Sequence, residues 1–311
     1  VTVFGVSAGA MSVVTLLSMP RSAGLFRRAI AQSGAGHQVL TSATARSVTG
    51  ELARRLGIEP TTEAFATIPA DRLIVEQRRL SGDIEAEPDP DRWGEIGLDS
   101  LPLAPVLDGA VLAARPMERL VAGAAGDIDL LIGTNRDELR LYLVPTGVID
   151  VIDAGALAGF AARLGLDPAG LTAYETPEAT PGDVFADVYT DWYFRIPAIR
   201  TAEAHRGRSH MYEFTWGSPL VDGRLGACHA LEVGFVFDTL DEAGGGPLWG
   251  PAPPRQLATA MHGAWVAFAT SGDPGWEAYG PDRRATMSFD VESTVVLDPR
   301  SARRSVWDGI R

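Results

Sequence analysis

Residues 1–20 read VTVFGVSAGAMSVVTLLSMP, and this stretch decides the fold. Its first four residues are apolar or β-branched and predict a strand, and apolar residues recur at helical spacing from Ala10 to Met19. Pro20 ends that helix. Between strand and helix lies Gly5-Val6-Ser7-Ala8-Gly9. A G-x-S-x-G bend between a strand and a helix is typical of a turn that raises a serine hydroxyl above a sheet.

Two features of this turn favour chemistry at Ser7. The glycines are needed because the strained backbone brings strand and helix too close for larger side chains. Ser7 also lies at a helix N-terminus, where unpaired N–H groups favour negative charge, so the Ala8 N–H is a candidate oxyanion donor. A turn of small residues without chemistry is the alternative. The pentapeptide alone leaves both open, and the strand and helix around it favour chemistry.

Length and composition limit the possible partners and sites. With 311 residues, 46% of them hydrophobic, the chain can bury a large core, and we expect one domain over residues 1–311. A net charge of −13 argues against nucleic acid or an anionic membrane as partner. The lone Cys228 excludes an intrachain disulfide, is compatible with a reducing compartment and favours a cytoplasmic location.

The sequence begins inside a predicted strand and has no initiator methionine. We therefore expect a truncated domain, the C-terminal part of a longer protein. Any export signal would lie upstream of Val1, outside this sequence.

Strands and helices alternate along the rest of the chain. Strands are predicted at 26–34, 127–135 and 209–216, and helices at 42–56, 152–164, 182–204 and 254–270. The acidic run 82–91 is predicted as a surface loop, and Gly244–Gly246 as a flexible loop rather than an oxyanion or phosphate loop. The alternation predicts an α/β fold, with helices on both faces of a mostly parallel sheet.

A reactive serine needs a base and a carboxylate that orients the base. Glu138 follows a predicted strand, at the edge of the sheet where active sites of open α/β folds lie, although a solvated turn is the alternative. His229 follows the next strand and is a candidate base, with His37 as its rival. The other three histidines are predicted within helices, His205 and His262, or in a strand, His210. No pair of histidines has metal-ligand spacing, so we predict no metal site.

With these residues aligned, the chain resembles the type-B carboxylesterase family of the α/β-hydrolase fold. Five ordered blocks carry the resemblance: VTVFG with SAG at 1–9, LFRRAIAQSG at 25–34, GTNRDE at 133–138, CHALE with FVF at 228–237, and SGDP at 271–274. The resemblance implies that Ser7 is the nucleophile, Glu138 the orienting acid and His229 the base. It implies hydrolysis of small-molecule esters through an acyl-enzyme, without a cofactor, as in para-nitrobenzyl esterases and cholinesterases.

The sequence departs from the family pattern in three places. Val6 stands where glutamate usually precedes the serine, so the buried polar support beneath the turn must differ. Leu139 stands where glycine usually follows the acid. The glycine loop that supplies further oxyanion N–H groups in the family, together with the first strands, is not among these 311 residues. We expect the isolated chain to aggregate and to be a poor enzyme.

Other functions on the same fold stay open. One is a non-catalytic binding or adhesion protein, and another is a thioesterase, lipase or amidase.

Trp192, Phe194 and Phe235 are candidate substrate-pocket residues, although aromatic side chains more often pack in the core. A neutral histidine base predicts activity that rises with pH through an apparent pKa of about 6 to 7. The natural substrate and the oligomeric state are not predicted.

Overall fold

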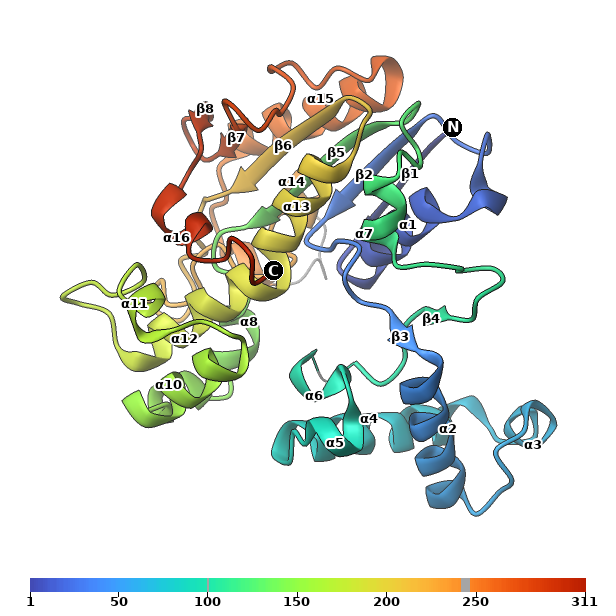
Figure 1. Ribbon diagram of the computed structural model, residues 1–311. Coiled ribbons are helices and arrows are strands. Elements are labelled where there is room, and N and C mark those ends of the chain that lie inside the picture. Colours follow the sequence, from blue (N-terminus) through green and yellow to red (C-terminus); the bar gives the residue numbers. More distant parts are fainter. Residues whose placement is uncertain (100, 242–246) are drawn as a thin grey trace. The chain divides into compact units, whose positions relative to one another are not determined.

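The computed structural model describes residues 1–99, 101–241 and 247–311 (Figure 1). The glycines Gly244–Gly246, predicted as a flexible loop, lie outside the described residues. The chain divides into two compact units, the first comprising residues 1–18, 22–36 and 116–311, and the second 19–21 and 37–115. One domain over residues 1–311 stays a prediction.

The first unit is built on a six-stranded sheet with the order β1-β2-β5-β6-β7-β8. Neighbouring strands are parallel from β1 to β7, and β8 is antiparallel to β7. The strands are β1 (Thr2–Val6), β2 (Arg28–Gln32), β5 (Asp129–Asn135), β6 (Ser209–Phe214), β7 (Ala285–Phe289) and β8 (Thr294–Leu297). This confirms the α/β fold class. The sequence interpretation missed β7 and β8.

Helices cover the two faces of this sheet (Figure 1). Helices α1 and α13 pack on strands at one face, with α7 beside them, and α15 lies on the other face. The helices of this unit are α1 (Ala8–Ser18), α7 (Pro116–Val121), α8 (Arg140–Leu143), α9 (Val148–Val151), α10 (Ala154–Arg163), α11 (Pro168–Leu171), α12 (Pro181–Thr190), α13 (Ile196–Ala204), α14 (Val233–Val236), α15 (Arg255–Ser271) and α16 (Ser301–Ser305). Within the described residues, no helix is both long and apolar enough to span a membrane.

The helix predicted over 182–204 is interrupted by a π-helical turn, Asp191–Arg195, between α12 and α13. Asp191 and Arg195 form a fully buried ion pair across this turn, with Arg195 Nε donating to Asp191 Oδ1 at 2.6 Å. Tyr174 Oη also donates to Asp191, at 2.7 Å. Turns of this kind redirect side chains and are frequent at functional sites.

The second unit is mostly helical: α2 (Ser42–Leu56), α3 (Thr62–Ala66), α4 (Ala70–Ala86), α5 (Pro90–Trp93), α6 (Ile96–Asp99), and the parallel pair β3 (Leu40–Thr41) and β4 (Val106–Leu107). Helix α2 has the predicted bounds, with Thr41 as N-cap and Gly57 in the left-handed region at its end.

The loop predicted at 82–91 was wrong at both ends, because α4 continues to Ala86 and α5 begins at Pro90. Leu80 and Ile84 lie four residues apart, on one side of the helix, and both are buried in a cluster with Leu52 and Trp93. This packing outweighs the acidic, loop-like composition of the segment.

A close approach in the centre of the sheet requires Gly133 of β5. A Cβ atom at Gly133 would lie 2.3 Å from both the ring and the carbonyl oxygen of Tyr212 on β6. The Tyr212 ring in turn packs edge-on against Trp265 of α15, with centroids 4.9 Å apart. Gly133 therefore lets the sheet, this ring and α15 pack together.

We predict that Gly133→Ala lowers the free energy of unfolding by about 3 kcal/mol, because neither the backbone nor the buried ring of Tyr212 can move aside. Gly263→Ala in α15 is the matched control. Nothing lies within 4 Å of the added methyl group there, so stability should rise by up to about 1 kcal/mol. Urea unfolding followed by circular dichroism measures both, and equal stability of the two variants would contradict the prediction.

Candidate active site

Ser7 lies at the bend between β1 and α1, in a strained backbone conformation. Its φ is 56°, in the left-handed region that residues other than glycine rarely adopt. The Ser7 N–H donates to the Gln32 carbonyl at 2.8 Å, and the Ser7 carbonyl accepts from the Met11 N–H at 3.0 Å. A Cβ at Gly5 would lie 2.4 Å from the Gly9 carbonyl carbon. The bend therefore tolerates no larger residue at Gly5.

Ala8 is the first residue of α1. The N–H groups of the first helical turn have no partner within the helix and lie at its positive end. The Ala8 N–H can therefore donate to an oxyanion that forms on a group attached to Ser7.

Glu138 and His229 are in direct contact, although 91 residues separate them. His229 Nδ1 donates to Glu138 Oε2 at 2.6 Å, and the Asn135 N–H donates to Glu138 Oε1 at 2.8 Å. Glu138 is fully buried and His229 nearly so. With Nδ1 bound in this way, Nε2 is the ring nitrogen that can accept a proton.

Backbone hydrogen bonds join the segments that carry these two side chains. The His229 N–H donates to the Glu138 carbonyl at 3.2 Å, and the Asp137 N–H donates to the Ala227 carbonyl at 2.9 Å. Leu139 has a right-handed helical conformation, with φ −70°, and its N–H donates to Thr190 Oγ1 at 3.2 Å. This position therefore does not need the glycine of the family pattern.

The surroundings of His229 act on its pKa in opposite directions. Burial lowers the pKa, whereas the charge and hydrogen bond of Glu138, with a further contribution from Glu232, raise it. The net effect is a pKa above the ordinary value of 6.5. A positive charge on this imidazole is therefore stabilised by its neighbours.

The three candidate residues follow the carboxyl ends of three parallel strands: Ser7 follows β1, Glu138 follows β5 and His229 lies beyond β6. The strand register puts Val6, Gln32, Gly133 and Tyr212 in one row across the sheet. Ser7 comes directly after this row, so it lies at the same edge of the sheet as the other two.

Two aromatic rings lie against His229. The Phe194 ring, from the π-helical turn, is 5.1 Å from the imidazole centroid, and the half-exposed Tyr142 ring, from α8, is 5.8 Å away. Of the three predicted pocket residues, Phe194 contacts the His229 ring, and the ring contacts of the other two are with other residues. Trp192 packs in an aromatic cluster under the Arg311 guanidinium, and Phe235 is fully buried against Phe214 and Trp216.

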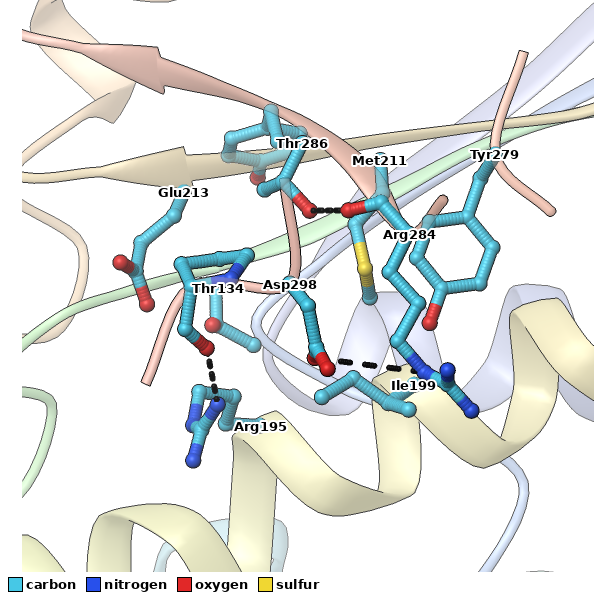
Figure 2. A pocket seen from close by; sticks show the side chains of 11 residues that line it. Thr134, Arg195, Ile199, Met211, Glu213, Tyr279, Arg284, Thr286 and Asp298 are labelled. Atoms are coloured by element: carbon cyan, nitrogen blue, oxygen red, sulfur yellow. Dashed lines mark hydrogen bonds and ion pairs between the residues drawn. The ribbon is translucent and has the colours of Figure 1, made fainter. Parts of the chain in front are cut away.

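A small cavity of about 20 Å³ lies elsewhere, between α13 and strands β6 and β7 (Figure 2). Figure 2 shows Arg195, Arg284 and Asp298 around it, and none of Ser7, Glu138 and His229 lines it. Its volume is enough for about one water molecule. The cavity is therefore too small to bind an ester.

Three of the other histidines have contacts of their own. His205 Nδ1 and Nε2 bond to Ser209 Oγ and the Ala125 carbonyl at 2.9 and 3.0 Å, and His262 Nδ1 donates to the Val236 carbonyl at 2.9 Å. His210 is buried between Phe268 and Trp276. Among the described residues, no group of three or more His, Cys, Asp or Glu side chains could hold a metal ion.

The sequence interpretation missed a buried polar network beside Glu138 and His229. Glu232 Oε1 accepts from Gln32 Nε2 at 3.1 Å, and Glu232 Oε2 accepts from Asn135 Nδ2 at 2.6 Å. Trp265 Nε1 donates to Gln32 Oε1 at 3.0 Å. Gln32, Asn135 and Glu232 all lie in the sequence blocks quoted above, but no residue spacing indicates that they meet.

Comparisons with known proteins agree with this fold. The profile described as "Carboxylesterase family" matches residues 1–150. The para-nitrobenzyl esterase of Bacillus subtilis (strain 168) is 34% identical over 98% of this chain and 61% of its own length. The phenmedipham hydrolase of Pseudarthrobacter oxydans is 33% identical over 95% of this chain and 60% of its own length.

A solved structure, the Geobacillus stearothermophilus carboxylesterase EST55, superposes with a TM-score of 0.81 at 32% identity, covering 98% of this chain and 63% of that protein. The chain thus spans about three fifths of the length of the relatives it matches. On the sequence matches and the shared fold, the chain belongs to the carboxylesterase family, the type-B carboxylesterases of the α/β-hydrolase fold.

Proposed function

We propose that this chain carries the catalytic residues of a serine carboxylic-ester hydrolase that works through an acyl-enzyme. The observation that carries the proposal is the 2.6 Å hydrogen bond from His229 Nδ1 to Glu138 Oε2, at the sheet edge where the strained Ser7 lies. Such a pair has the components that activate a serine hydroxyl: a base and a carboxylate that orients it.

In this mechanism Ser7 Oγ attacks the ester carbonyl while His229 Nε2 takes its proton. Glu138 keeps the imidazole in the required tautomer and stabilises its positive charge, and the Ala8 N–H donates to the oxyanion. His229 then gives its proton to the departing alcohol. Water, activated by the same base, releases the acid and regenerates Ser7. No cofactor takes part.

For the substrate we propose a small-molecule ester with an aromatic group next to the reacting carbonyl. Phe194 and Tyr142 provide aromatic surface beside the base, and such rings stack favourably on one another. The names of two relatives, para-nitrobenzyl esterase and phenmedipham hydrolase, support small molecules as substrates. We propose neither nucleic acid nor a membrane as partner, in keeping with the net charge of −13.

The first prediction is that a fluorophosphonate labels Ser7, with a mass increase on the peptide that contains it. In a longer version that carries the upstream glycine loop, Ser7→Ala should remove labelling and should lower turnover by roughly 10⁴-fold or more, and His229→Ala should lower turnover to a similar extent. Ser12→Ala, one turn along α1, is the matched control. Labelling of Ser12 instead would contradict Ser7 as the nucleophile, and no labelling of a folded chain would favour a non-catalytic binding protein.

The second prediction concerns pH. The base acts when neutral, so kcat/KM should fall as the pH drops through the His229 pKa, which Glu138 and Glu232 hold above 6.5 despite burial. Glu138→Gln should move this acid limb to lower pH, because it removes the neighbouring negative charge. A rate that stays flat from about pH 5 to 8 would argue against His229 as the base.

The third prediction is that the isolated 311-residue chain is impaired. Each missing oxyanion donor costs roughly 3 kcal/mol, or about 10²- to 10³-fold in rate. Within the described residues β1 pairs only with β2, so its open edge, with Val1 and Phe4 exposed, should also promote aggregation. The test compares p-nitrophenyl ester hydrolysis and light scattering with those of a longer version that carries an upstream glycine loop. Equal activity of the two would contradict the proposal.

A further inference from the structure

A second buried carboxyl group, Glu232, lies beside the proposed base and has no role in the mechanism above. It is fully buried, and within the described part of the chain no arginine forms an ion pair with it. The donors to it among the described residues are two amide groups, Gln32 Nε2 at 3.1 Å and Asn135 Nδ2 at 2.6 Å. Burying a carboxyl group without a cation is unfavourable, so its position needs an explanation.

Asn135 connects Glu232 to the proposed acid and base. Its backbone N–H donates to Glu138 Oε1 at 2.8 Å, and its Nδ2 donates to the Cys228 carbonyl at 2.7 Å as well as to Glu232. Cys228 directly precedes His229. Asn135 therefore holds the acid with one group and the loop of the base with another, and Glu232 fixes the amide that does so.

The other donor to Glu232 comes from beneath the Ser7 bend. Gln32 lies in register with Val6, the residue before Ser7, and is held by Trp265 of α15. Val6 carries no polar group. The carboxyl group that Gln32 binds is therefore supplied by the segment after His229 rather than by the bend itself.

Four titratable groups among the described residues interact electrostatically with Glu232: Glu138, His229, Cys228 and Tyr212. Burial and the charge of Glu138 raise the pKa of Glu232. Burial, followed by the neighbouring carboxylates, raises the pKa of the Cys228 thiol to about 12 and that of Tyr212 well above its ordinary value, so both stay neutral. His229 is thus the one group of the four that can become a cation.

We propose that Glu232 is a positioning residue for the base, which fixes Asn135 and the Cys228 carbonyl and stabilises the imidazolium when His229 takes the Ser7 proton. The reaction places a positive charge on His229 only transiently, and two carboxyl groups then share it. The geometry of the acid and base is held by a hydrogen-bond network that does not itself touch the substrate. This inference rests on the proposed function.

The test is an NMR titration of the histidines through their ring Cε1–H signals in the longer version that carries the upstream glycine loop, with His229→Gln for assignment. Glu232→Gln should lower the His229 pKa by on the order of one pH unit, because one nearby negative charge is lost. Glu95→Gln is the matched control, because Glu95 also accepts two hydrogen bonds, from Thr41 and Thr44, but lies in the other unit. It should leave the His229 pKa unchanged.

A His229 pKa that Glu138→Gln lowers and Glu232→Gln leaves unchanged would overturn this inference and leave the proposed function intact. If Glu138→Gln also had no effect, the proposed triad itself would fail. Should Glu232→Gln not fold, Glu232→Asp replaces it. The shorter side chain draws the charge back from Asn135 and His229, so His229 should again titrate at lower pH, and an unchanged value would contradict the inference.

Discussion

The hydrogen bond between His229 and Glu138 is the interaction on which the candidate site depends. It is short, at 2.6 Å, and it lies where both side chains are almost inaccessible to water. Such a bond forms only if the segments after β5 and β6 meet, and parallel strands with neighbouring carboxyl ends bring them together. The sheet therefore brings together two side chains whose contact no local sequence pattern indicates.

The same sheet edge carries a strained residue and a buried network. The Ser7 backbone lies in the left-handed region, and a residue there is held by its surroundings rather than by its own preference. Gln32 serves both sides of the site, since its carbonyl accepts from the Ser7 N–H and its amide donates to Glu232. Backbone and side chain of one β2 residue thus connect the bend of the proposed nucleophile to the loop of the proposed base.

Local patterns in the sequence predict the parts of the fold whose cause is local. The bend at Ser7, helix α2 with its caps, and the apolar strand β5 follow from turn residues, capping residues and hydrophobic spacing. The helical structure of segment 82–86 could not be predicted in this way, because it depends on packing of Ile84 against residues distant in the sequence, such as Leu52. The π-helical turn likewise carries an ion pair, between Asp191 and Arg195, that only the fold buries.

The candidate site was predictable only in part for the same reason. Residue type and position after a strand suggested Glu138 and His229, but the resemblance to a family was needed to choose His229 over His37. Glu232 and Tyr142 were not identified, because in the sequence a buried carboxyl group looks like an acidic turn residue and a half-exposed ring looks like a surface aromatic residue.

The most direct test of the central claim is the proton NMR signal of the His229 Nδ1–H, which a short hydrogen bond to a carboxylate shifts far downfield. The account predicts that this signal is present, is lost in Glu138→Gln and moves when a phosphonate is attached to Ser7; a signal that stays unchanged on modification of Ser7 would contradict it.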